Sequence, residues 1–241
     1  MRVTLYWFEL SNPGQAVRLM LEHKGMPYRT RDLIPGLHPL QVRAAGFPAA
    51  TVPALRIDGR RVQGSLRISR ELERLSPEPP LFPAGRREAV EEAERWGEAV
   101  LQPVTGRVFH WACANDVGLR EWLARSSGVP RGAAAALARL GRPLAHLFAR
   151  DAPDSAVRAD LAALPGMLDH VDALIAAGTI GAEPTAADFQ IATTVREVMS
   201  YECLAPLVRG RPAADLALRV LPDWAESPVR VPPGWLPALP A

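Results

Sequence analysis

The sequence predicts two domains of different class: an α/β domain with a mixed four-stranded sheet over residues 1–76, and an all-helical domain over residues 87–221. Three observations support this. Strand-like and helical segments alternate up to about residue 75, no convincing strand follows them, and a proline cluster over residues 77–86 has the composition of a linker. A second proline-rich stretch, residues 222–241, predicts an extended C-terminal tail on the surface.

The first domain begins with a strand, a helix and a second strand. Residues 2–8 contain strand formers with apolar side chains at alternate positions. Asn12–Pro13 then opens a helix with a capping residue followed by proline, and Gly25 ends that helix. Residues 28–33 form the second strand. This order predicts a right-handed βαβ unit with two parallel strands.

A hairpin completes the sheet. Residues 35–50 are predicted as a loop or broken helix, and residues 51–57 as the third strand. Asp58–Gly59 is a strong signal for a two-residue turn, so residues 60–63 return antiparallel to the third strand. The sheet is therefore mixed. Ser65 then caps a helix whose apolar face continues to residue 75.

Apolar residues at helical spacing dominate the second domain. Residues 90–108 form a long amphipathic helix that we expect to be kinked or broken at Pro103. The pattern continues over residues 132–149 and 157–177, and Pro165 would allow the latter to be two helices. Further on, Asp188 follows Thr185 by three residues, just before another helical stretch at residues 189–198. That spacing is typical of a capping box, with Asp in place of the usual Glu.

Composition excludes several classes of protein. The net charge is +2 and no basic run is present, so no nucleic-acid partner is expected. No apolar run reaches the length of a membrane span, and the N-terminus has no signal-peptide pattern. The only cysteines, Cys113 and Cys203, are too isolated to form a metal site or a disulfide framework. A reducing, cytoplasmic location and no metal cofactor are therefore expected.

Ser11 is the strongest candidate for chemistry in the first domain. It lies where the first strand ends and the first helix begins, so Ser11 and Asn12 have a simple interpretation as helix caps. The same geometry can also stabilise a sulfur anion, because the first helical turn has unpaired N–H groups and a partial positive charge. Lowering a thiol pKa by about two units requires roughly 2.7 kcal/mol. A single hydrogen bond to a charged group supplies about 1.5–3 kcal/mol.

Two further motifs have both a structural and a ligand-binding interpretation. Pro53 cannot donate to a sheet, so Val52-Pro53 is either an ordinary edge element or a free edge whose backbone pairs with an extended peptide. Ser65 is a good helix cap, but a helix N-terminus also binds carboxylates. Gly64 allows an unusual backbone angle there. Three features that suit either a helix cap or edge, or the binding of an anion or a thiol, thus converge on one small domain.

The order of these motifs resembles the glutathione S-transferase superfamily, and in particular its theta-like members. The resemblance rests on Leu10-Ser11-Asn12-Pro13, on residues 51–55, on Asp58-Gly59 with Gly64-Ser65, and on the motif at residues 185–189. It implies a thioredoxin-like N-terminal domain that binds glutathione and an all-helical C-terminal domain. It also implies a transferase that conjugates glutathione, as co-substrate, to small electrophiles in detoxification, and that commonly forms homodimers.

The resemblance implies a role for each matched residue. Ser11 would activate the glutathione sulfur, with Asn12 beside it, and Val52 would pair with the cysteinyl unit next to a cis Pro53. Ser65 would bind the γ-glutamyl carboxylate. His38 would contact the glycyl carboxylate, or would be an ordinary loop residue. The family usually has an acid or amide immediately before the serine, where this chain has Gly64, so Gln63 would have to substitute.

The second substrate would be a small-molecule electrophile bound partly by the helical domain. Trp7 and Phe8 end the first strand, and Phe109, His110 and Trp111 lie late in the first long helix, although aromatic residues at helical spacing are commonly core residues. Two alternatives stay open. The chain would be a glutathione-dependent isomerase of a small unsaturated acid, or a binding or scaffold protein that keeps the fold without turnover.

Overall fold

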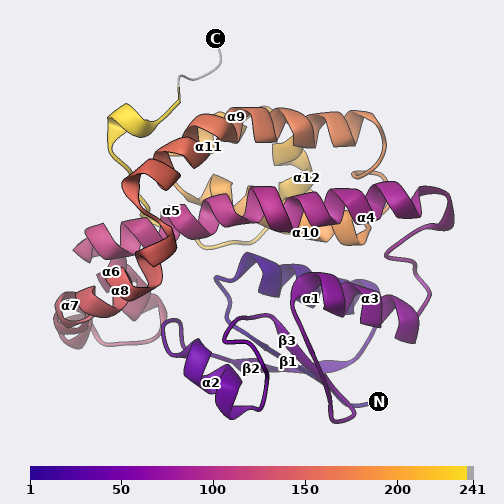
Figure 1. Cartoon of the computed structure of the whole chain (residues 1–241), viewed down its shortest axis with the longest axis horizontal. Helices are drawn as coiled ribbons and strands as arrows, with labels where there is room; N and C mark the ends of the chain where they lie inside the picture. The colour runs from indigo at the N-terminus through magenta and orange to yellow at the C-terminus, as the bar shows by residue number, and fades with distance from the viewer. Residues whose placement is uncertain (238–241) are drawn as a thin grey trace.

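The computed structural model describes residues 1–237 and shows a four-stranded sheet followed by a helical region (Figure 1). β1 pairs in parallel with β2 and antiparallel with β3, and β3 pairs antiparallel with β4. The spatial order is therefore β2-β1-β3-β4, and the prediction of a mixed sheet is confirmed. The strands are β1 (Val3–Trp7), β2 (Tyr28–Asp32), β3 (Ala54–Ile57) and β4 (Arg60–Gln63).

Helices cover both faces of this sheet. Alternate residues of β1 face opposite sides: Leu5 belongs to the main core with α1 (Asn12–His23) and α3 (Ser65–Leu75), whereas Tyr6 packs on the small cluster that includes Val42 of α2 (His38–Ala44). α2 thus lies within the segment predicted as a loop or broken helix. β3 begins three residues later than predicted, directly after Pro53, which has no N–H to donate to a ladder.

Nine α-helices follow in the described chain between residues 87 and 220, and in Figure 1 the longest of them lie side by side above the sheet. They are α4 (Arg87–Trp96), α5 (Gln102–Asn115), α6 (Val117–Ser126), α7 (Arg131–Leu140), α8 (Arg142–Phe148), α9 (Asp154–Ala176), α10 (Ala186–Ser200), α11 (Ala205–Val208) and α12 (Pro212–Val220).

Proline interrupts these helices less than predicted. α4 and α5 form one continuous rod through a π-helical turn at Gly97–Leu101, which ends two residues before Pro103, so the helix is irregular but not broken at this proline. Pro165 lies inside α9, which is one helix rather than two. The stretch 132–149 is divided instead, because α7 ends at Leu140 and α8 begins at Arg142.

α10 is the central helix of the molecule and lies between the two parts of the chain. It packs against α1, α4 and α12, and nearly all of its residues are buried. The predicted capping box is confirmed: Asp188 Oδ2 accepts from the Thr185 N–H at 2.9 Å, and the Asp188 N–H donates to Thr185 Oγ1. Gly97 permits close packing on α10, since a Cβ there would lie 2.9 Å from Cγ1 of Ile191.

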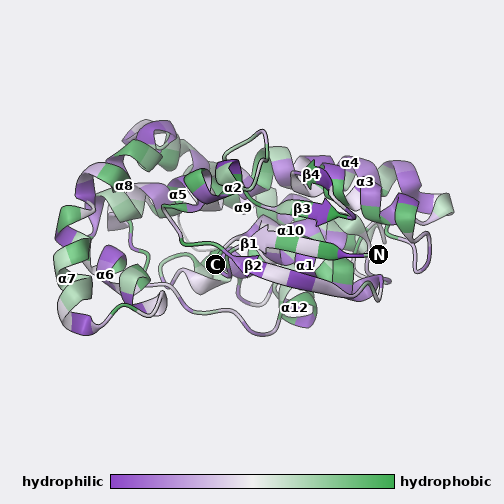
Figure 2. Ribbon diagram, turned by 90° about the horizontal axis from the view of Figure 1, so that it is seen from below, coloured by the Kyte–Doolittle hydropathy of each residue, from purple (hydrophilic) through white to green (hydrophobic). Residues whose placement is uncertain are grey.

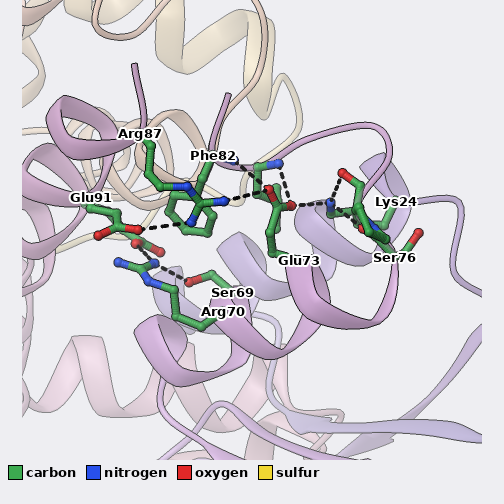
Figure 3. Close-up of polar contacts among 11 residues, drawn as sticks. Lys24, Ser69, Arg70, Glu73, Ser76, Phe82, Arg87 and Glu91 are labelled. Carbon is green, nitrogen blue, oxygen red and sulfur yellow. Dashed lines mark hydrogen bonds and ion pairs between the residues drawn. The ribbon is translucent and has the colours of Figure 1, made fainter. Parts of the chain in front are cut away.

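The linker between α3 and α4 is fixed by the single lysine of the chain (Figure 3). Nζ of buried Lys24 donates to Glu73 Oε2 at 2.5 Å and to the Ser76 carbonyl at 2.6 Å. The same Glu73 carboxylate accepts from the backbone N–H groups of Leu81 at 2.9 Å and Phe82 at 3.2 Å. A buried ion pair therefore ties α1, α3 and the linker together.

The C-terminal tail is partly buried, although its prolines predict a surface segment. Val229 and Val231 are buried, and Ser227 forms a bridge with Tyr201. The ring of Trp235 lies 4.8 Å from that of Trp111 and so holds the tail against α5. Residues 238–241 of the predicted tail lie outside the described residues. Among residues 1–237, no helix is both long and apolar enough to cross a lipid bilayer.

Candidate functional site

Ser11 is the N-cap of α1. Its Oγ accepts a hydrogen bond from the Gly14 N–H at 3.2 Å, and its own N–H donates to the Phe8 carbonyl at 3.0 Å. Gly14 lets the turn close on the serine, because a Cβ there would lie 3.1 Å from Ser11 Oγ. Ser11 is 6% exposed, so only a small part of it is accessible. The hydroxyl uses an acceptor site in the cap, which leaves its O–H as a donor.

Asn12 faces the helical region. Its Nδ2 donates to Glu197 Oε2 at 2.7 Å, to Thr105 Oγ1 at 3.2 Å and to Thr194 Oγ1 at 3.4 Å. Glu197 is fully enclosed, and burial raises the pKa of its carboxyl to about 7 against the hydrogen bonds that it accepts. The structure therefore places Asn12 in a contact between α1, α5 and α10. The predicted contact of Asn12 with glutathione stays a prediction.

The segment that precedes β3 presents a free backbone. The Val52–Pro53 peptide bond is cis. Within the described chain, neither the N–H nor the carbonyl of Val52 has a hydrogen-bond partner. The Gln63 amide holds the segment in place: Nε2 donates to the carbonyls of Ala49 at 3.0 Å and Thr51 at 2.7 Å. Gln63 therefore supports the loop that carries Val52, and its predicted contact with glutathione stays a prediction.

A carboxylate from the helical region lies at the start of α3. Gly64 is the N-cap residue, with a φ of 90°, a value that favours glycine. The buried Ser65 hydroxyl donates to Glu98 Oε1 at 2.9 Å. The site at Ser65 thus combines the free N–H groups of a helix N-terminus with a half-buried acid. Sequence reasoning missed Glu98, because its spacing in the helix shows only that it lies on the polar face.

The aromatic residues predicted to line a second-substrate pocket do not all lie together. Trp7 is buried in the core, and its Nε1 donates to Asp32 Oδ1 at 2.8 Å. Trp111 lies under the tail, against Trp235, and donates to Asp154 Oδ1 at 2.8 Å. Phe109 is half-buried and packs on the main core. Among the residues predicted for this pocket, Phe8 and His110 join a cluster at the domain boundary.

That cluster brings Phe8 together with His38, Phe148 and His110. The ring centroid of His38 lies 5.1 Å from that of Phe8 and 6.1 Å from that of Phe148. The Phe148 ring in turn lies 6.2 Å from that of His110. Phe8 precedes the serine, His38 opens α2, and the other two belong to α8 and α5. Phe148 was not predicted, because α8 has no pattern that marks an inward-facing aromatic.

Three segments of the first domain offer groups that can bind a ligand. Ser11 offers a hydroxyl, Val52 an unpaired backbone, and the start of α3 offers N–H groups beside an acid. Among residues 1–237, no group of three or more His, Cys, Asp or Glu side chains is arranged to hold a metal ion.

The sequence of the first domain matches a known family. Residues 5–80 match the family model described as "Glutathione S-transferase, N-terminal domain". This match covers the first domain, and residues 1–237 share the fold of glutathione S-transferases of known structure. No curated protein matches the sequence of this chain.

Solved structures share the fold at low sequence identity. A glutathione S-transferase from Rhodospirillum rubrum is 22% identical, with a TM-score of 0.56 over 97% of each chain. The β-etherase LigF from a Sphingobium species is 17% identical, with a TM-score of 0.64 over 91% of this chain and 94% of its own. A maleylacetoacetate isomerase from Anaeromyxobacter dehalogenans, with glutathione bound in its active site, is 21% identical. Its TM-score is 0.55 over 91% of this chain and 89% of its own.

Proposed function

We propose that the protein is a theta-like glutathione transferase, which conjugates the glutathione thiol to a small electrophile, and that Ser11 stabilises the thiolate. The observation that carries the proposal is the O–H of the Ser11 cap at the positive end of α1, which donates to no group among residues 1–237. A donated hydrogen bond and the helix terminus both favour the anion over the thiol, so they lower the thiol pKa toward neutrality. The reactive thiolate then attacks the electrophile.

The neighbouring groups support binding of glutathione in an extended conformation. The free N–H and carbonyl of Val52 can pair with the cysteinyl unit as in strand addition. The backbone N–H groups at the start of α3 suit the γ-glutamyl carboxylate. Glu98 supplies the negative charge that binds the γ-glutamyl ammonium. The family usually has an acid or amide at the position of Gly64, and in this chain the acid comes from the helical region instead. His38 is available for the glycyl end.

The test is the pKa of the bound thiol, measured from thiolate absorbance against pH, together with the conjugation rate. Ser11→Ala is expected to raise that pKa and to lower the rate about tenfold or more, whereas Ser11→Thr keeps a hydroxyl and keeps most of the rate. Because loss of a cap costs about 1 kcal/mol, folding of each variant is checked by circular dichroism. An unchanged thiol pKa in Ser11→Ala would rule out the role of this serine.

A second candidate is glutathione-dependent isomerisation of a small unsaturated acid, favoured by the shared fold with the maleylacetoacetate isomerase. Both enzymes need the thiolate, so a panel of electrophiles and unsaturated acids separates them. If calorimetry shows no glutathione binding at millimolar levels, the protein is a binding or scaffold protein of the same fold.

We also infer a cytoplasmic homodimer. Both cysteines are free, which suits a reducing compartment. A depression of about 440 Å³ between α3 and α4 is lined mostly by arginines, and α4 also carries exposed glutamates, so two copies related by a two-fold axis can pair opposite charges there. Light scattering tests the dimer.

A further inference from the structure

α7 turns its small side chains inward and its large apolar side chains outward. Ala134 and Ala138, one helical turn apart, are buried, and Nε of Arg120 on α6 donates to the Ala138 carbonyl at 2.6 Å. By contrast, Leu137 is 51% exposed and Leu140 is 78% exposed. A helix that serves only its own fold places its leucines toward the core. The packing of α7 on the protein therefore does not use these two leucines.

The exposed apolar residues of α7 form one stripe. Four exposed residues follow the i, i+3, i+4, i+7 spacing of a single helix face, namely Ala133, Ala136, Leu137 and Leu140. α8, which follows after one residue, adds two exposed leucines, Leu144 and Leu147. Figure 1 shows α6, α7 and α8 as a lobe at one end of the molecule, and hydrophobic segments of α7 lie on its outer edge in Figure 2. The stripe therefore lies on the outside of the α6–α8 lobe.

The same lobe carries a concentration of positive charge. Residues 117–150 contain six arginines but only one acidic residue, Glu121, although the whole chain has 28 lysines and arginines against 26 aspartates and glutamates. Five of the six arginines are exposed, namely Arg125, Arg131, Arg139, Arg142 and Arg150. Among residues 1–237, none of these five forms an ion pair. The lobe thus presents positive charge beside an apolar stripe.

This combination fits the surface of an anionic lipid bilayer. Leucines can enter the boundary between the headgroups and the acyl chains, and the long arginine side chains can reach back to the lipid phosphates. A second copy of the lobe fits less well, because it would place arginines against arginines. A nucleic acid would bind the arginines through its phosphates, but its backbone offers no apolar surface to the leucines.

We propose that the α6–α8 lobe docks the protein on membranes that contain anionic phospholipids, with Leu137 and Leu140 inserted and the five exposed arginines at the headgroups. The attachment is peripheral, because α7 has 10 residues and is too short to cross a bilayer. The lobe is separate from Ser11, Val52 and the start of α3, so the inference does not rest on the proposed function.

Co-sedimentation of the full chain with lipid vesicles tests the docking. The vesicles consist of phosphatidylcholine alone, or of equal parts of phosphatidylcholine and phosphatidylglycerol. We expect binding to the vesicles with phosphatidylglycerol to be about tenfold tighter or more. This preference should be lost at about 1 M salt, where charges are screened beyond roughly 3 Å. Equal binding to both kinds of vesicle at low salt, or binding to neither, would overturn the proposal.

Leucine variants test the insertion. Leu137→Ser and Leu140→Ser are each expected to weaken binding to the anionic vesicles at least about threefold, because the leucine no longer leaves water. Leu218→Ser is the matched control, since Leu218 on α12 is 43% exposed, close to the value for Leu137. The control should bind like the unaltered protein, and circular dichroism checks the folding of each variant. An equal loss in Leu218→Ser and Leu137→Ser contradicts insertion by α7.

Arginine variants test the charge of the lobe. Arg139→Gln combined with Arg142→Gln should weaken binding to the anionic vesicles at least about tenfold. Arg29→Gln combined with Arg31→Gln removes the same charge from exposed positions of β2 and should change binding less than about twofold. Equal losses in the two double variants would show a general effect of net charge and would contradict docking by the lobe. If the chain binds soluble polyglutamate and not the vesicles, the partner is an acidic protein and the proposal is wrong.

Discussion

Nδ2 of Asn12 donates to Oε2 of Glu197 at 2.7 Å, and this hydrogen bond joins the first turn of α1 to the last turn of the central helix, α10. Oε1 of the same carboxyl accepts from the Tyr201 hydroxyl at 2.9 Å. The residue next to the proposed catalytic serine is thus fixed by a buried acid of the helical region. Loss of these hydrogen bonds would disturb the position of Ser11, although Ser11 itself makes none of them.

Glu197 should make the stability of the protein depend on pH. Burial raises the pKa of Glu197 to about 7 from an ordinary value of 4.5. Between these values the folded protein keeps a proton that the unfolded chain has released, so the free energy of unfolding falls as pH rises through this window. In Glu197→Gln this contribution is absent. Between about pH 5 and about pH 8, the free energy of unfolding of this variant should therefore fall less than that of the unaltered protein, by on the order of 1 kcal/mol in urea unfolding.

Glu94 titrates in the same direction, since burial raises the pKa of its carboxyl to about 7 despite its ion pair with Arg70. Glu94 is present in both the unaltered protein and the Glu197→Gln variant. The difference between their pH dependences of unfolding free energy therefore reports on Glu197 alone. Parallel pH curves for the two proteins would show that Glu197 is ionised in the folded state.

Removal of Lys24 should destabilise the whole protein. The Lys24 side chain is fully buried, and its loss leaves Glu73 and the Ser76 carbonyl without this donor. Breaking a buried pair from one side costs about 3–5 kcal/mol. We expect Lys24→Ala to lower the free energy of unfolding by about that amount in urea.

Arg18→Ala is the control for Lys24→Ala, because it removes a positive charge from the surface of the same helix. The partner of Arg18, Glu22, is exposed, so loss of this ion pair should cost about 0.5 kcal/mol or less. Equal losses of stability in the two variants would show that the buried pair contributes no more than the surface pair.

His38 should lower stability in acid. Its folded pKa of about 4 lies below the ordinary value of 6.5, so the unfolded chain binds a proton first as pH falls. The stabilisation present above about pH 6.5 is therefore lost progressively down to about pH 4. His38→Phe keeps a ring beside Phe148 and should lose less stability over this range in thermal unfolding. His146→Phe, at an exposed position of α8, is the control and should follow the unaltered protein.

The sequence predicted the architecture well, because the deciding signals are local. The Asp58–Gly59 turn, the Asn12–Pro13 helix start and the Thr185–Asp188 box each act within a few residues. The site was predicted less completely. Glu98 meets Ser65 across 33 positions, and Phe148 meets His38 only because α8 returns to α2. No local periodicity encodes such contacts. Gln63 shows that nearness in sequence can also mislead. It lies two residues before Ser65, but its side chain donates to the loop that precedes β3.

Glu98 should provide the charge that binds the γ-glutamyl ammonium. Its carboxylate already accepts from the Ser65 hydroxyl at 2.9 Å, so it lies at the helix terminus proposed for the same end of glutathione. Glu98→Gln keeps the hydrogen-bond acceptor and removes the charge. We expect the Kd for glutathione to rise about tenfold, on the scale of a hydrogen bond to a charged group, with the rate at saturation changed less than about twofold.

A glutathione analogue without the amino group separates a direct contact from a general effect. The unaltered protein should bind the analogue about tenfold more weakly than glutathione, whereas Glu98→Gln should bind the two alike, because the coupling between the two groups is lost. Glu92→Gln removes an exposed charge from α4 and should keep the full preference. If Glu98→Gln still discriminates between the two ligands as the unaltered protein does, the ammonium is bound elsewhere.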